Sequence, residues 1–330
     1  MRLDRISVQV FGVVRAAARS VSLGPTLLRA RQAWRFGFEI EAHTFLAKRR
    51  HLKAAATLKP ISGGEGTVDC FMLLNEPRVW EGIWSLYSFR FYFGPCRLIV
   101  LNDGTLKPSS IATLKKIFPG ISIPAFEANN REIDVHLKGA SLVRCRDWRR
   151  EFVLFRKLVD PVYLAQSDKI VVLDSDVLHF QPPEEVQSWS RRPDEFRYIA
   201  DPNINSHCAP AEELTNVCGA PLPKYFNAGY VCFPRSMIDL ARVERNLAAQ
   251  CFERQRLSGR FNHFAEQTLY AMEAAVGCAR ILPPAYATCP DPDTDFVVMG
   301  HFCGGDYRRT WLYTKGLPFL SLGIASVGVP

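Results

Sequence analysis

Residues 169–173 read Lys-Ile-Val-Val-Leu, an apolar run behind a single lysine that ends at Asp174. A strand that is apolar at every position is buried on both faces, which is typical of the middle of a parallel sheet covered by helices. Upstream, 68–74 and 97–101 have strand patterns, and 78–93 between them has a helical one. The pattern predicts an α/β fold built around such a sheet.

Further elements follow from turn residues and periodicity. Helices are expected over 109–118 and over 148–159, the second ended by Asp160-Pro161, and a short strand over 121–123. The chain has 330 residues, 48% hydrophobic and 22% charged, which is the balance of a soluble globular protein rather than a disordered or fibrous one. This length suits one large α/β domain with an extension about as well as two smaller domains.

The net positive charge is confined to one end of the chain. Residues 1–60 contain 12 Lys and Arg against 3 Asp and Glu, a net +9, and the rest of the chain carries −1. Over 26–58, one stripe of apolar residues recurs at spacings of 7, 4, 7 and 7, which predicts an amphipathic helix; the stripe consists of Leu27, Trp34, Phe38, Phe45 and Leu52. Its basic face would contact an anionic membrane or simply be solvated, and its apolar stripe would lie on a membrane, pair with a helix or cover the main domain.

Pro60 and the glycine-rich run that follows interrupt any helix. We therefore expect a helical extension over 1–60, a linker over 61–67 and the main domain over 68–330.

Ten cysteines occur without any Cys-x-x-Cys pair, which argues against zinc-site and thioredoxin-like spacings. Most lie in apolar runs and are interpreted as small core residues in a reducing compartment.

The longest uncharged stretch, 316–330, is shorter than the ~20 residues of a membrane span. Asp4 and nearby arginines disfavour a signal peptide. A cytoplasmic protein with peripheral contact at the inner face of a membrane is expected.

Asp174-Ser175-Asp176 follows the apolar strand directly. Ligands of open α/β sheets bind outside the carboxyl ends of strands. Adjacent carboxylates repel each other and are costly to desolvate, and a divalent cation relieves both problems. A turn that caps backbone amides is the alternative. A haloacid dehalogenase-like phosphatase, with Asp174 as nucleophile, is another, although Leu178 replaces its usual Thr or Val and no later acidic cluster is evident.

Four downstream or flanking segments resemble motifs of glycosyltransferase family 8, in the family's order. Residues 225–231 resemble its F-N-[SA]-G-V segment, 264–269 its D-Q-D helix start, 300–304 the opening of its H-x-x-G-x-x-K-P-W motif, and 155–158 its helix with a donor-binding basic residue. The resemblance spans roughly 68–315. It implies a GT-A (Rossmann-like) domain with a mixed, mostly parallel sheet.

The resemblance also implies roles for the metal site. Asp174, Asp176 and His301 would bind Mn²⁺ or Mg²⁺, which bridges the phosphates of a nucleotide-sugar donor. Two carboxylates and an imidazole suit these ions. A lone histidine after an apolar strand is otherwise a structural residue. Residues that would contact the donor are Asn75, Lys157 (with Arg156 as substitute), Ser175, Ala228, Gly229, Gly304 and Arg308.

Catalytic roles are implied for four residues: Glu266, Gln267, Asn227 and Lys157. Glu266 and Gln267 would lie near the anomeric carbon, where they stabilise positive charge; the alternatives are a helix N-terminal acid and a solvated amide. The chain departs from the family at Thr268, in place of an Asp, and at Tyr307, in place of a Lys followed here by two arginines.

The sequence thus predicts a metal-dependent hexosyltransferase that uses a nucleotide diphosphate donor, with UDP as the expected nucleotide and retention implied by the family. The acceptor would be a glycan, lipid or protein hydroxyl, and no nucleic-acid partner is expected. A non-catalytic scaffold of the same fold, or the phosphatase, are the alternatives.

Overall fold

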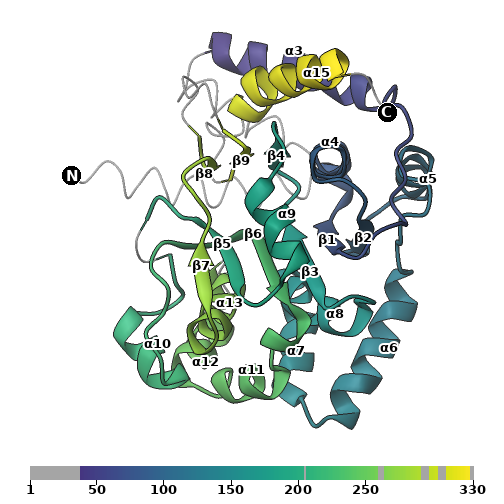
Figure 1. Ribbon diagram of the computed structural model, residues 1–330. Coiled ribbons are helices and arrows are strands. Elements are labelled where there is room, and N and C mark those ends of the chain that lie inside the picture. The colour runs from purple at the N-terminus through teal and green to yellow at the C-terminus, as the bar shows by residue number, and fades with distance from the viewer. Residues whose placement is uncertain (1–37, 204–205, 259–263, 291–296, 304–309, 328–330) are drawn as a thin grey trace.

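The computed structural model describes residues 38–203, 206–258, 264–290, 297–303 and 310–327 (Figure 1). Its main sheet has six strands in the order β2-β1-β3-β6-β5-β7. β6 pairs antiparallel with both neighbours and the other pairings are parallel. The strands are β1 (Asp69–Leu74), β2 (Arg97–Asn102), β3 (Lys169–Leu173), β5 (Phe196–Ala200), β6 (Phe226–Pro234) and β7 (Ala279–Ile281). The mixed, mostly parallel α/β sheet is confirmed.

Helices cover both faces of this sheet, as the apolar run in β3 predicts. Val171 and Leu173 belong to one core cluster, and Ile170 and Val172 to the other. The helices in the first cluster include α4 (Val79–Phe93), α5 (Pro108–Ile117) and α9 (Glu184–Arg191). The helices in the second are α6 (Phe126–Gly139), α7 (Val143–Glu151), α8 (Arg156–Leu164), α10 (Ala211–Cys218), α11 (Leu240–Asn246), α12 (Gln250–Leu257) and α13 (Phe264–Val276).

A second, three-stranded sheet lies beyond the carboxyl end of β3. It contains β4 (Val177–His179), β9 (Met299–His301) and β8 (Tyr286–Thr288), with β9 in the middle. β4 begins directly after the acidic turn and pairs antiparallel with β9, so that Val177 lies opposite His301. This pairing brings two segments more than a hundred residues apart to the same edge of the main sheet.

The chain termini of the described part lie against the first core cluster. α3 (Phe38–Ala55) contacts α4 and the π-helix η4 (Leu312–Gly316), which continues into α15 (Leu317–Val327) (Figure 1). The Trp84 indole donates a hydrogen bond of 3.0 Å to the His51 carbonyl. The described part of the amphipathic helix therefore covers the domain, and its predicted start over 26–37 lies outside the described residues. None of the described helices is long and apolar enough to cross a membrane.

The glycine-rich segment after α3 contacts the sheet. The Gly63 carbonyl accepts a hydrogen bond of 2.7 Å from the Leu98 amide, and Gly64 bridges to Arg97. The predicted strand over 121–123 is reduced to a single bridge between Ser122 and Ile99.

The single helix predicted over 148–159 is wrong. The chain breaks after α7, forms the short 3₁₀ helix η2 (Val153–Phe155), and α8 then continues through Pro161. Proline has no amide hydrogen, so it leaves the Lys157 carbonyl without a helical partner. The Tyr270 hydroxyl from α13 donates to that carbonyl at 2.5 Å. This tertiary contact offsets the lost helical hydrogen bond.

Candidate metal centre

The acidic turn follows β3 at the carboxyl edge of the main sheet, and β3 lies between β1 and β6 (Figure 1). The Asp174 amide donates a hydrogen bond of 2.8 Å to the Gly229 carbonyl, which continues the β3–β6 ladder by one residue. The Ser85 hydroxyl of α4 donates to the Asp174 carbonyl at 3.0 Å. Asn75 follows β1, which is parallel to β3, and so lies at the same edge.

The three side chains expected to bind a metal lie together. His301 Nε2 is 3.3 Å from Asp176 Oδ1 and 3.7 Å from Asp174 Oδ2. One ligand atom from each residue fits within a group whose members are all within 4.8 Å of one another. Ligands of a cation with bonds of about 2.1 Å lie roughly 3 Å apart in adjacent positions and about 4 Å apart in opposite ones. The residues therefore fit a hard or borderline divalent ion.

His301 is aimed into this cluster but is poorly satisfied by the protein. The residue is 3% exposed, and neither ring nitrogen has a well-aligned hydrogen-bond partner among the described residues. A buried polar atom without a partner is costly. A cation bound to Nε2 would satisfy this nitrogen and use the nearby carboxylates at the same time.

Gly229 provides the space for the His301 ring. A methyl group built on Gly229 would overlap the imidazole, because its three nearest atoms are all ring atoms of His301. The backbone of Gly229 is in an ordinary conformation, so the requirement for glycine here is steric. From the sequence, Gly229 is expected to contact the donor; in the structure, its lack of a side chain makes room for the imidazole.

The side chains of the cluster stabilise one another in their charged forms. Burial alone would lower the pKa of His301, but Asp176 and Asp174 outweigh it and raise that pKa above its ordinary value. Burial alone would raise the pKa of Asp176, but His301 and Arg78 lower it below its ordinary value. Asp176 is thus ionised at neutral pH, as a metal ligand requires.

Lys157 links the metal cluster to Glu266. Its ammonium is 2.7 Å from Asp174 Oδ1 and 3.3 Å from Glu266 Oε1, and its side chain is 3% exposed. Burial would lower the pKa of Lys157, but the two carboxylates raise it, so the ammonium stays charged. Lys157 and Glu266 come from α8 and from the first turn of α13.

Burial raises the pKa of Glu266 to about 7, although Lys157 opposes the shift. Because this pKa is above that of the unfolded chain, the native state holds the proton more tightly. The resulting stability is present below about pH 4.5 and is lost as pH rises through about 7, by at most about 3 kcal/mol. We expect urea unfolding in a chelator to show this loss in the native protein but not in Glu266→Gln. Equal pH dependence in the two proteins would contradict the assignment.

The side-chain amides of Asn227 and Gln267 form hydrogen bonds within the protein. Asn227 Nδ2 donates to Asp201 Oδ2 at 2.9 Å, and its Oδ1 accepts from the Gly229 amide at 2.8 Å. Gln267 Oε1 accepts from the Ala228 amide at 3.0 Å, and its Nε2 donates to the Ser206 carbonyl at 2.7 Å. Both side chains thus hold the β6 segment that carries Gly229.

The other predicted site residues are half-buried or lie outside the described residues. Asn75 is half-buried, and its Oδ1 has no hydrogen-bond partner among the described residues. Ser175 is half-buried in the acidic turn. Gly304 and Arg308 lie outside the described residues.

Two residues near the site escaped sequence reasoning. Arg78, at the end of the 3₁₀ helix η1 (Glu76–Arg78), lowers the pKa of Asp176. Asp201, just after β5, accepts from Asn227 and also from the Ser206 hydroxyl at 2.8 Å. Thr268, which departs from the pattern that the chain resembles, is buried, and its hydroxyl accepts from the Cys208 amide at 2.9 Å. Arg78 and Asp201 both follow strands of the main sheet, and this position in the sequence could have identified them as site residues.

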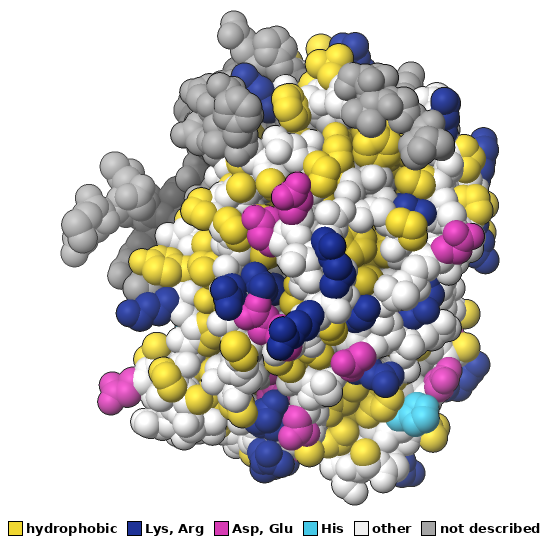
Figure 2. Space-filling view, viewed as in Figure 1, with side chains coloured by type: hydrophobic (Ala, Val, Ile, Leu, Met, Phe, Trp, Pro, Cys, Tyr) yellow, Lys and Arg dark blue, Asp and Glu magenta, His cyan; other side chains and the backbone are white. Residues whose placement is uncertain are grey.

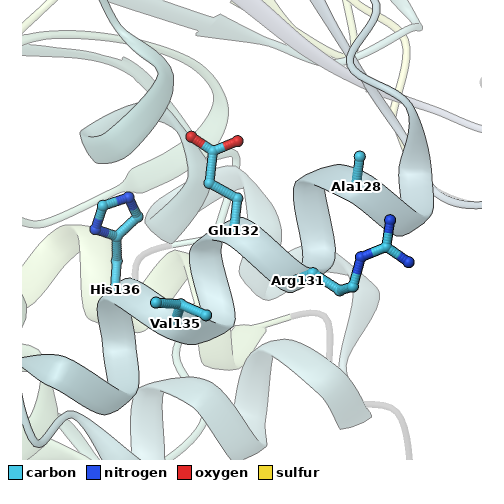
Figure 3. A pocket seen from close by; sticks show the side chains of 5 residues that line it. All are labelled: Ala128, Arg131, Glu132, Val135 and His136. Atoms are coloured by element: carbon cyan, nitrogen blue, oxygen red, sulfur yellow. The ribbon is translucent and has the colours of Figure 1, made fainter.

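A separate hollow of about 370 Å³ lies along α6 (Figure 3). It is lined by Ala128, Arg131, Glu132, Val135 and His136, all from one helix. It contains none of the predicted site residues, and no polar groups from a second element converge on it.

No family model and no curated protein matches the chain in sequence. Solved structures do resemble it. An active-site mutant of LgtC is 14% identical, with a TM-score of 0.50, and the match covers 79% of this chain and 97% of that one. The galactosyltransferase LgtC with donor and acceptor sugar analogs is 15% identical over the same shares, with a TM-score of 0.45. Mouse xyloside xylosyltransferase 1 is 10% identical, covering 73% and 98%, with a TM-score of 0.46. The chain has the fold of a GT-A glycosyltransferase.

Proposed function

We propose that the protein transfers a hexose-type sugar from a nucleotide diphosphate donor, UDP being the expected nucleotide, to a hydroxyl acceptor in a metal-dependent reaction. The observation that carries this proposal is the convergence of Asp174, Asp176 and His301 at the carboxyl edge of the β-sheet. That edge is where open α/β sheets bind their ligands. A Mn²⁺ or Mg²⁺ ion held there would neutralise charge that develops on a departing diphosphate.

The protein's own side chains support the same reaction. Lys157 carries a positive charge beside the metal ligands, where it would lie next to the phosphate or the sugar of the donor. Asn75 Oδ1, at the end of β1, has no hydrogen-bond partner within the described part of the chain and would accept a hydrogen bond from the base or ribose. Glu266, beside Lys157, lies where a carboxylate can stabilise positive charge on a sugar ring.

We propose further that the chain is a distant relative of glycosyltransferase family 8 and retains the configuration of the donor sugar. Two segments that resemble family motifs, although distant in sequence, meet at the hydrogen bond between Gln267 and the Ala228 amide. A third segment supplies His301, which lies over Gly229 of the first. Segments that resemble motifs by chance would have no reason to converge. NMR of the anomeric proton in the product tests retention.

The proposal is tested by UDP release from a panel of UDP-sugars, with Mn²⁺, with Mg²⁺ and in a chelator. Release above background that requires the ion supports the proposal. A thermal-shift screen of nucleoside diphosphates runs beside it, since a ligand specific for the native state must raise the melting temperature. Ion-dependent binding of a donor without turnover would favour the non-catalytic scaffold. The fold does not support the alternative of a phosphatase. Release of phosphate from simple esters would favour that alternative.

We also propose that the protein contacts anionic membranes through the face formed by α3 and α15. Hydrophobic side chains gather near the upper edge of the molecule, in the area of α15 (Figure 2). Phe319 and Leu322 of α15 are 56% and 72% exposed, and Leu46 of α3 is 62% exposed. Residues 1–60, the segment of the sequence that includes α3, carry a net charge of +9, which complements anionic lipid headgroups.

Leu322→Ser is expected to weaken co-sedimentation with phosphatidylserine vesicles several-fold, because apolar area inserted into the interface is lost. Leu257→Ser is the matched control, since Leu257 is 76% exposed but lies on α12 at the other end of the molecule (Figure 1). Binding should also fall with added salt. Equal losses in the two variants, or equal binding to neutral vesicles, would contradict membrane contact through this face.

A further inference from the structure

Two of the ten cysteines lie side by side next to the metal centre. Cys289 Sγ and Cys303 Sγ are 3.4 Å apart, and the Cys289 thiol also donates a hydrogen bond of 3.4 Å to the Cys303 carbonyl. Both residues are half-buried, whereas six of the other cysteines are buried. The interpretation of the cysteines as separate core residues therefore does not extend to this pair.

The backbone holds the two sulfurs in this position. Cys289 follows the last residue of β8, and Cys303 lies two residues after the end of β9, which is paired in parallel with β8. The Cys289 amide donates a hydrogen bond of 2.7 Å to the His301 carbonyl. Cys289 also has a φ of +54°, which is uncommon for a residue with a side chain and turns the chain sharply after β8.

We propose that Cys289 and Cys303 form a reversible disulfide bond that fastens the strand end carrying His301 to β8. A disulfide has a sulfur–sulfur distance of about 2 Å, so the sulfurs must approach by little more than 1 Å, which side-chain rotation can supply. The bond closes the loop from 289 to 303 and thereby restricts the unfolded chain. The inference does not rest on the proposed sugar transfer, since it concerns a modification that needs neither donor nor metal.

The oxidant is a small-molecule disulfide such as oxidised glutathione. One thiolate attacks it, forming a protein–glutathione mixed disulfide and releasing one reduced glutathione. The second protein thiolate then attacks the protein sulfur of the mixed disulfide and releases the other reduced glutathione. Two protein thiols are oxidised, one oxidised glutathione is reduced to two thiols, and the two thiol protons pass to solvent or to the glutathione released.

The sequence makes the product easy to detect. Trypsin cleaves after Arg280 and Arg308, and the peptide between these sites contains Cys289 and Cys303 as its only cysteines. After oxidation and alkylation, the peptide is expected to be lighter than its dithiol form by two hydrogen atoms and to carry no alkyl group. Cleavage at the aspartates between the two cysteines should then leave two chains joined until a reductant is added. Alkylation of both thiols, or stable glutathione adducts at either residue, would overturn the proposal.

Thermal unfolding of the full chain provides the second measurement. Oxidised protein should melt several degrees above reduced protein, and Cys289→Ser and Cys303→Ser should each abolish that difference. Cys278→Ser is the control, because Cys278 is exposed and outside the pair, and it should preserve the difference. A difference that persists in Cys289→Ser would assign the effect to other cysteines and overturn the proposal.

Discussion

Asp176→Asn is expected to lower metal-dependent turnover of the donor by on the order of 100-fold or more, and to weaken Mn²⁺ binding by a similar factor. Replacing residues that only orient metal ligands already costs 10–100-fold in affinity or activity. An amide keeps the shape of the Asp176 side chain, whose oxygen lies 3.3 Å from His301 Nε2, but it removes the negative charge. UDP release and titration with Mn²⁺ measure the two effects.

Asp168→Asn is the matched control for this prediction. Asp168 precedes β3, whereas the acidic turn follows it, so the same substitution is made at the opposite end of one strand. Its side chain is exposed and distant from the site. Asp168→Asn should keep activity and Mn²⁺ affinity within about twofold of the native protein. Full metal-dependent activity in Asp176→Asn would refute the assignment of this carboxylate as a ligand.

Gly229→Ala is expected to destabilise the protein by about 1–3 kcal/mol or more and to abolish Mn²⁺ binding. The added methyl group would occupy the position of the His301 ring, and Gly229 lies in the central strand β6, where its carbonyl accepts from the Asp174 amide and its amide donates to Asn227 Oδ1. Either the imidazole leaves the carboxylates or the strand distorts. Urea unfolding and Mn²⁺ titration measure the result.

Two further variants separate this clash from a general effect of alanine. Gly139→Ala, at the end of α6, has no neighbour within 4 Å of the added methyl group and should be neutral or slightly stabilising. The double variant Gly229→Ala, His301→Ala should recover much of the stability that Gly229→Ala loses, without recovering metal binding, because the two positions share one space. Additive losses in the double variant would show that the imidazole is not the obstacle.

Local sequence patterns predicted the strands and helices well where a single pattern, an apolar run or a helical period, was clear. β1, β2, β3, α4 and α5 begin and end within about two residues of expectation, because a fully apolar strand or an amphipathic period leaves few alternatives. The pattern failed at 148–164, where Pro161 suggested a helix end. The hydroxyl of Tyr270, more than a hundred residues further along the chain, makes the proline tolerable inside α8. The residues close to Pro161 in the sequence do not reveal this contact.

The sequence by itself determined which carboxylates stand at the end of a buried strand, since Asp174 and Asp176 follow the apolar run directly. Only the tertiary structure decided what joins them. The β4–β9 pairing brings His301 opposite Val177, the β3–β6 ladder brings Gly229 beside Asp174, and the packing of α8 and α13 sets Lys157 between Asp174 and Glu266. Such contacts depend on sheet register and helix packing between distant segments, and these are set by the burial of the whole core rather than by the residues near the site.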